Sequence, residues 1–211
     1  MGYVRQNSLV GQGESTFAEG IASRMGFGVA LDFYTYMVLA GAAYQVRAGT
    51  ITTPLIGDVV ITDTAAEMCA DCVAGTCIMP VYLNIGVRLG GGTLHEYAAK
   101  SVATVSSAGT AFTPLPLRSN GAAAVTTARV SAAGGVTVTG ELATTTLRHW
   151  NWANPVAVGA GNEPDPMVWE PRCPPVLVGA RCFYVQIAAT TTGPSYYANF
   201  DYFEVPTATL L

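Results

Sequence analysis

The chain has 211 residues, of which half are hydrophobic and only 11% are charged, and its formal net charge is −4. This length suits one β-domain with a sizeable core, and no charge run or Pro/Ser-rich break divides the chain. Lys100 is the single lysine and the arginines are scattered, whereas a nucleic-acid-binding module needs clustered basic side chains. The composition therefore argues against a direct nucleic-acid site.

The low charge also bears on association. Ordinary soluble domains carry roughly 25% charged residues, so Ala, Thr, Gly, Ser and backbone must cover most of this surface. Such a surface is poorly protected against association. We therefore expect a homo-oligomer, a trimer or larger, with much of its surface buried against other subunits.

The start of the chain, Met1–Gln6, lacks the apolar segment of a secretory signal and the Ser or Thr of a myristoylation signal. The longest apolar uncharged stretch, Phe33–Val46, has 14 residues and is too short to span a bilayer. We expect a chain that is made in the cytosol and has no membrane partner.

The first 25 residues are rich in Gly, Gln, Asn, Ser and Glu and have weak periodicity, which is typical of an arm. A short helix from Ser15 to Met25, with Ser15 as its N-cap, is a second possibility that Gly20 weakens. We expect an extended N-terminal arm over residues 1–30 and a β-sandwich domain over residues 31–211.

Strand patterns follow the arm. Phe33–Leu39 is rich in aromatic and β-branched residues, and in Ala42–Ala48 apolar residues alternate with Gln45 and Arg47. A further short strand is expected over Ile56–Thr62.

The clearest alternation in the chain is Val81–Leu89, which Gly90–Gly92 ends. The next segment, Ser101–Thr146, is rich in small residues, but its β-branched content favours ordered strands over disorder. Within it, Asn120–Gly121 is a hairpin-turn signal. Leu147–Trp152 is predicted to be another strand.

Pro155–Pro175 contains several prolines and is predicted to be a long, contact-forming connection. Val176–Val205 is then predicted to be a hairpin of two alternating strands, joined by the polar turn Thr190–Ser195. The apolar face of this hairpin is expected to point into the core, and it consists of Phe183, Val185 and Ile187 with Ala198, Phe200 and Tyr202. Counting gives eight to ten strands and no long helix, which predicts an all-β, two-sheet antiparallel sandwich.

The cysteines offer the strongest metal-like motif. Cys69 and Cys72 form a C-x2-C knuckle, but a zinc ribbon needs a second knuckle or a His pair, and Cys173 and Cys182 have the wrong spacing for one. Three interpretations stay open for Cys69, Cys72 and Cys77. They are a structural zinc site, a disulfide of Cys69 or Cys72 with Cys77, and reduced thiols packed as small apolar groups, which the spacing favours.

An acidic series, Asp58, Asp63, Glu67 and Asp71, precedes the clearest strand. Carboxylate oxygens are calcium ligands, but this spacing fits no calcium motif. We therefore expect a solvated acidic face.

Catalytic signals are absent from the sequence, which has no G-x-S-x-G, Walker or H-E-x-x-H motif. His149, between Arg148 and Trp150, has no identifiable partner, which favours packing or a subunit contact over a general base. We expect no enzyme, and no catalytic residue, cofactor, metal site or small-molecule substrate.

Five aromatic residues form a candidate contact set. They suit carbohydrate stacking, but interface anchoring explains the same residue types and is favoured. The set is Trp150, Trp152, Trp169, Tyr196 and Tyr197.

Pro174–Ile187 and Tyr197–Pro206 resemble the last two strands of viral jelly-roll structural proteins. The Ala/Thr/Gly-rich segments Ala48–Pro54 and Ala132–Val138 are similar in style to virion proteins of bacteriophages, and the outline is similar to tumour necrosis factor-like trimeric jelly rolls. The resemblance spans most of residues 40–206 and is one of style and strand order. It implies an eight-stranded jelly-roll sandwich that assembles, and it transfers no catalytic residue.

This resemblance implies a structural component of a phage or viral particle, located in the virion. Such a protein would form or decorate the capsid shell through contacts with its own copies and with other capsid subunits, which the arm would clasp. The alternative is a trimeric receptor- or glycan-binding spike or fibre domain, which the aromatic set would serve. An enzyme on a β-sandwich is a third hypothesis that lacks a site.

Overall fold

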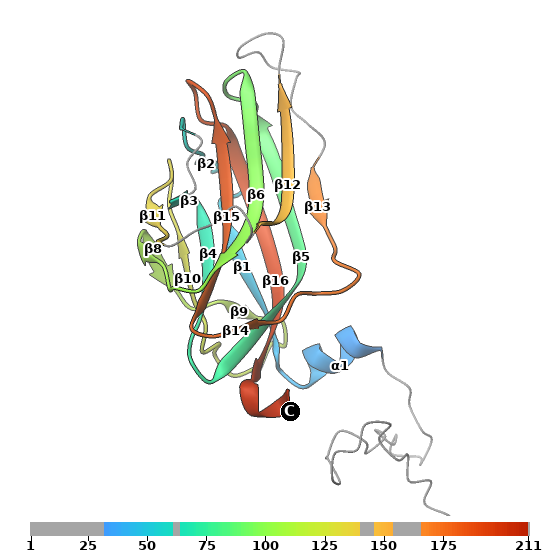
Figure 1. Cartoon of the computed structure of the whole chain (residues 1–211). Helices are drawn as coiled ribbons and strands as arrows, with labels where there is room; N and C mark the ends of the chain where they lie inside the picture. The colour runs from blue at the N-terminus through green and yellow to red at the C-terminus, as the bar shows by residue number, and fades with distance from the viewer. Residues whose placement is uncertain (1–31, 61–63, 140–145, 154–165, 211) are drawn as a thin grey trace, which may run out of the picture.

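The computed structural model describes residues 32–60, 64–139, 146–153 and 166–210. In these residues, antiparallel strands form two large sheets that pack face to face, and a small third sheet (Figure 1). The predicted all-β sandwich is confirmed, while the jelly-roll strand order stays a prediction. The predicted arm over residues 1–30 and the possible helix from Ser15 to Met25 lie outside the described residues.

The strands are distributed as follows. The seven-stranded sheet has the order β13 (Met167–Trp169), β5 (Thr76–Leu89), β16 (Ser195–Pro206), β1 (Ala43–Ala48) and β9 (Leu115–Pro116), with β14 (Leu177–Val178) on β5 and β2 (Leu55–Ile56) on β16. The six-stranded sheet has the order β12 (Thr146–Ala153), β6 (Leu94–Val102), β15 (Arg181–Ala189), β4 (Met68–Cys72), β10 (Thr127–Val130) and β8 (Thr110–Phe112). The small sheet is β3 (Ala65–Ala66), β11 (Val136–Thr137) and β7 (Ser107–Ala108). Helix α1 (Phe33–Leu39) and the 3-10 turn η3 (Thr207–Thr209) complete the described elements.

The core lies between the two large sheets. Phe183 of β15 and Phe200 of β16 stack across it, with ring centroids 4.2 Å apart. All six residues that were predicted to face inward belong to this core: Phe183, Val185, Ile187, Ala198, Phe200 and Tyr202. Burial of each large side chain contributes about 1.5–3 kcal/mol, so this layer supplies the main stabilisation of the sandwich.

The predicted hairpin over Val176–Val205 is wrong. The two strands exist, but β15 pairs with β6 and β4, whereas β16 pairs with β5, β1 and β2. The connection between them therefore crosses from one sheet to the other. Both strands have one apolar face, and in opposite sheets these faces meet across the core instead of lying side by side.

Glycine residues let the crossing connection lie close to its neighbours. Gly92 donates its N–H to the Thr192 carbonyl at 2.8 Å, and Gly57 donates to the Pro194 carbonyl at 2.7 Å. A Cβ atom on Gly92 would overlap the Thr190 carbonyl oxygen, so a larger residue does not fit there.

Phe33–Leu39, predicted as a strand, is the helix α1. The Asp32 side chain caps it by accepting the Thr35 N–H at 3.0 Å, and Gly41 follows its end with φ +75°. The Phe33 ring lies 5.5 Å from the ring of Phe203 on the outer face of the seven-stranded sheet. Aromatic and β-branched content favoured a strand, but the cap and this packing decide for a helix.

Three further predictions need correction. Of the strand expected over Ile56–Thr62, the described part shows the end of β2 at Ile56 and an isolated β-bridge between Asp58 and Ala188. Asn120–Gly121 lies in a turn, where the Gly121 N–H donates to the Arg118 carbonyl at 2.8 Å, but the adjoining strands β9 and β10 belong to different sheets, so it makes no hairpin. The predicted connection Pro155–Pro175 contains β13. The other predicted strands, in Ala42–Ala48, Val81–Leu89 and Leu147–Trp152, are confirmed.

The small sheet covers part of the outer face of the six-stranded sheet. A second buried cluster forms between them, separate from the main core, and it consists of Ala66, Cys69, Val102, Val136, Val138, Cys182 and Tyr184. Strands β4 and β15 are thus buried on both faces. No helix in the described part of the chain is long and apolar enough to cross a membrane.

Candidate functional site

A cluster of two thiols and a carboxylate lies beneath the small sheet. Cys69 and Asp71 are two residues apart on β4, so both side chains point to its outer face. Cys182 on β15 is the register partner of Asp71. The three ligand atoms lie within 4.8 Å of one another, and all three residues are buried.

Ser106 and Arg129 hold the Asp71 carboxylate. Ser106 donates its backbone N–H at 2.8 Å and its hydroxyl at 2.7 Å, and the Arg129 Nε lies 3.5 Å away. The Ser106 oxygen is also 2.9 Å from the Cys69 sulfur. Because the Ser106 hydroxyl proton goes to Asp71, the Cys69 thiol is the donor in that contact.

The local environment keeps the Cys182 sulfur protonated. Burial raises its pKa well above the ordinary thiol value, and the neighbouring Cys69 and Asp71 raise the pKa further. Without a cation in the cluster, Cys182 is therefore a neutral thiol.

The C-x2-C pair does not form a knuckle. Cys69 and Cys72 are three residues apart on β4, and this spacing places them on opposite faces, with Cys72 in the main core and Cys69 in the second cluster. All five cysteines are free, and four of them are buried, so the structure agrees with the interpretation of reduced thiols. Burial raises the pKa of both Cys72 and Cys77.

The predicted solvated acidic face is wrong for Glu67 and Asp71, which are both buried. The Glu67 carboxylate accepts the N–H of Asp58 at 3.0 Å and the N–H of Ile187 at 2.7 Å. Burial raises the pKa of Glu67 to about 8, although these two donors act in the opposite direction. Asp63 lies outside the described residues.

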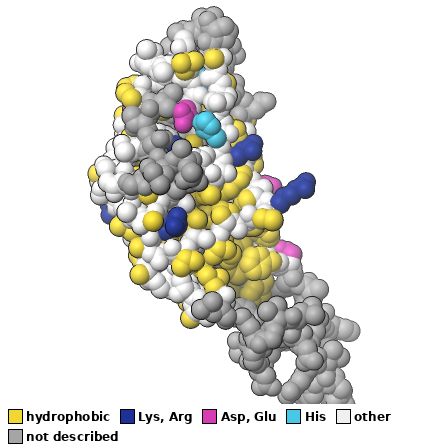
Figure 2. Space-filling model, viewed as in Figure 1, with side chains coloured by type: hydrophobic (Ala, Val, Ile, Leu, Met, Phe, Trp, Pro, Cys, Tyr) yellow, Lys and Arg dark blue, Asp and Glu magenta, His cyan; other side chains and the backbone are white. Residues whose placement is uncertain are grey.

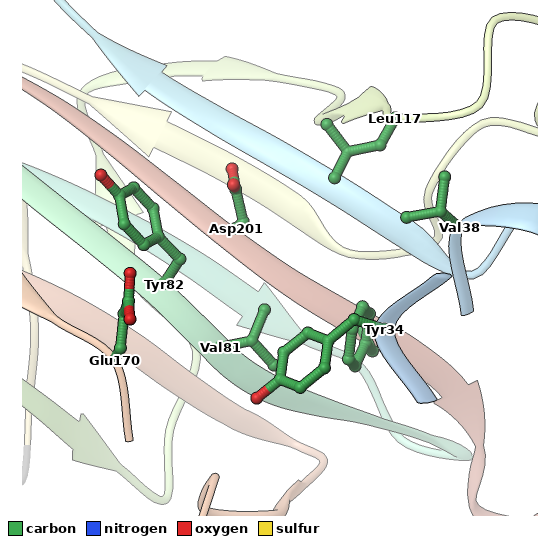
Figure 3. Close-up of a pocket in the computed structure, with 8 residues that line it drawn as sticks. Tyr34, Val38, Val81, Tyr82, Leu117, Glu170 and Asp201 are labelled. Carbon is green, nitrogen blue, oxygen red and sulfur yellow. The ribbon is translucent and has the colours of Figure 1, made fainter. Parts of the chain in front are cut away.

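A pocket of about 390 Å³ lies between α1 and the outer face of the seven-stranded sheet. Figure 3 shows Tyr82, Glu170 and Asp201 on one side of it and Val38 and Leu117 on the other. Asp201 accepts a hydrogen bond from Gln45 at 2.7 Å, and burial raises the pKa of its carboxyl group. One side of the pocket is thus apolar, and the other side carries two carboxylates.

Apolar side chains are exposed around this pocket. Leu117 lines it and is 41% exposed, Tyr34 lines it at 47%, and Phe33 and Leu39 on α1 are each 52% exposed. Figure 2 shows hydrophobic side chains gathered at this end of the molecule with few charged groups among them. We call Phe33, Tyr34, Leu39 and Leu117 the α1 surface.

The five aromatic residues do not form one platform. Tyr196 is fully buried in the core, and Trp169 packs there against Phe183. Trp152 stacks on the His95 ring at 4.5 Å and on the Tyr97 ring at 4.6 Å. The set therefore serves mainly the sandwich itself.

Trp150 and Tyr197 have local partners. The Arg148 guanidinium lies 5.3 Å from the Trp150 ring centroid, and the Tyr197 ring covers Gly86, where a Cβ atom would collide with it. His149, on the exposed side of β12, lies 3.4 Å from the Glu96 carboxylate, which is a surface pair rather than a catalytic arrangement.

Sequence reasoning found Cys69 but did not group it with Asp71 and Cys182. Two-residue spacing within a strand could have placed Cys69 and Asp71 on one face. Cys182 is 113 residues along the chain from Cys69, and only the pairing of β4 with β15 brings it there. Comparisons with protein-family models, with curated proteins and with solved structures found no match.

Proposed function

We propose that this chain is a structural component of a phage or viral particle, which forms or decorates the capsid shell through subunit contacts. The α1 surface is the observation that supports assembly through subunit contacts. The particle itself is proposed from the sequence resemblance described above.

The α1 surface supports assembly because it is apolar, exposed and continuous with the pocket. Its four large side chains lie on α1 and directly after β9, next to a seven-stranded sheet whose core face is already filled. Exposed apolar groups that gather in one place mark contact sites in soluble proteins. A second copy of this chain is the proposed occupant, because such a sparsely charged chain has little to prevent self-association.

Light scattering on the full chain at low micromolar concentration tests assembly. We expect a trimer or larger species, and we expect Leu39→Ser with Leu117→Ser to weaken association about tenfold or more, because each loses buried apolar area. Ile51→Ser is the matched control. Ile51 is 63% exposed and follows the end of β1 that is remote from α1, so its substitution should leave the mass unchanged.

Two results would overturn this part of the proposal. One is a wild-type chain that scatters only as a 21.9 kDa monomer. The other is an Ile51→Ser variant that dissociates as readily as the double variant, because the α1 surface would then have no special role.

Copy number in the native particle tests the shell role against the spike alternative. A shell or decoration protein should be present in far more copies than a receptor- or glycan-binding spike. We favour the shell because the aromatic residues that suit a glycan site are divided between the core and separate places on the surface.

A further inference from the structure

We propose that Cys69, Asp71 and Cys182 bind one zinc ion, which fastens the segment before β7 to the outer face of the six-stranded sheet. The proposal differs from the expectation that the chain has no metal site. It is independent of the proposed role in a particle.

The donor set suits zinc. Two cysteine sulfurs and a carboxylate oxygen are ordinary zinc ligands, and Zn–S bonds of about 2.3 Å place two sulfurs on one ion roughly 3.8 Å apart. The three ligand atoms already lie within 4.8 Å of one another. Shifts of about 1 Å or less would therefore bring them to one tetrahedral centre.

A disulfide does not explain the two cysteines equally well. Cys69 is the register partner of Tyr184, and Cys182 is the partner of Asp71, so the two cysteines are diagonal neighbours on adjacent antiparallel strands. Diagonal neighbours lie about 7–8 Å apart, with their Cβ atoms somewhat closer than this. A disulfide needs about 3.5–4.5 Å, whereas a bound ion can span the larger separation.

The surroundings of Asp71 resemble the outer shell of a metal site. An ionised carboxylate has about four acceptor positions, and the Ser106 N–H and hydroxyl occupy two of them, while the Arg129 guanidinium lies 3.5 Å away as an ion-pair partner. Acceptor positions therefore remain for a metal, and the two Ser106 donors fix the orientation of the group. The Ser106 oxygen, close to both Asp71 and Cys69, is placed to be the fourth ligand.

Charge in the cluster is balanced when zinc is bound. Two thiolates, one carboxylate and Zn²⁺ sum to −1, and the Arg129 guanidinium next to Asp71 offsets this charge. The two thiol protons leave to solvent on binding. Arg129 also donates to the Ala108 carbonyl on β7 at 3.2 Å, so the same residue joins the cluster to the small sheet.

Metal content and cobalt spectra of the full chain test the proposal. Protein purified without chelator from zinc-supplemented cells should hold one zinc per chain. Cobalt added to the metal-free protein should give sulfur-to-cobalt charge-transfer absorption together with the visible bands of tetrahedral cobalt.

Variants locate the site. Cys69→Ser and Cys182→Ser should abolish the charge-transfer bands, and Ser106→Ala should weaken binding by about 10–100-fold if it acts as a ligand or an outer-shell partner. Cys72→Ser and Cys77→Ser are the controls, because both thiols are buried elsewhere and should keep wild-type metal binding.

Hydrogen exchange reports the structural role. Removing zinc should speed amide exchange in residues 103–110 and leave β16 unchanged, because only the former segment is held by the cluster.

The proposal is wrong if wild-type protein retains no zinc and gives no sulfur-to-cobalt band, a result that does not depend on any variant folding. It is equally wrong if Cys72→Ser removes the band as Cys182→Ser does, or if mass spectrometry finds a Cys69–Cys182 disulfide in the native chain.

Discussion

Acidic side chains on the outer faces of the two large sheets differ in burial. On the six-stranded sheet, Asp71 is buried and accepts hydrogen bonds from the backbone N–H and the hydroxyl of Ser106. On the seven-stranded sheet, Asp201 is half-buried and Gln45, itself bonded by the exposed Arg47, donates to it. Both positions look polar in the sequence, yet only Asp71 is buried.

The difference teaches that alternation identifies the apolar face of a strand without showing what happens to the other face. A carboxylate can be buried when enough donors reach it, and a buried group that loses its partners is costly. Asp71 meets this condition because Ser106, just before β7, supplies two donors, and the cluster beneath the small sheet is closed to solvent.

The largest expected loss of stability comes from removing a core side chain, compared with removing one from an outer face. Phe200→Ala should lower the free energy of unfolding by about 3–5 kcal/mol, through lost burial and the cavity that remains against Phe183 and Tyr202. Asn199→Ala, next in sequence and on the outer face, should cost under about 1 kcal/mol, unless a subunit contact covers it. Guanidinium titration of both variants measures this. A severe Asn199→Ala with a mild Phe200→Ala would mean that β16 faces the other way.

A smaller loss of stability is expected when an aspartate is removed from the outer face of either sheet, and the two losses can be compared. Asp71→Ala, measured with a chelator present, should cost about 1–3 kcal/mol, because the Ser106 N–H and hydroxyl lose their acceptor in a buried place. Asp201→Ala should cost under about 1 kcal/mol, because Gln45 can turn to water. Equal losses in urea titrations would show that the two faces are similarly closed.

A pH dependence of stability is expected from Glu67. Its folded-state pKa, about 8, lies above the ordinary value of 4.5, so the folded chain binds more protons between these limits. The contribution of Glu67 to stability should therefore be greatest below pH 4.5. It should fall as the pH rises towards 8, by at most about 1.4 kcal/mol per pH unit.

Glu67→Gln tests this, because the amide does not titrate. The variant should flatten the decline, while lowering stability at acid pH, since its NH₂ group cannot accept the second backbone N–H. Unfolding titrations across this pH range on both proteins measure the slope. A wild-type slope that survives in the variant would assign the pH dependence to other groups.

Local patterns were reliable where a strand has one apolar face and one polar face. Val81–Leu89 lies within β5, and the inward residues of β15 and β16 were correctly predicted. Predictions failed where pairing or capping decides. Thr190–Ser195 carried turn residues, but a turn motif does not reveal whether the next strand joins the same sheet. Phe33–Leu39 had strand-like composition, but Asp32 caps a helix there.

The sequence by itself determined the all-β class, the positions of most long strands and the side of each that enters the core, because a two-residue period expresses the strand geometry directly. Only the tertiary structure decided which strands share a sheet, since register and pairing depend on contacts between distant segments. The meeting of Cys69, Asp71 and Cys182 depends on that pairing. Burial of Glu67 likewise required a backbone donor 120 residues away at Ile187, which no local pattern encodes.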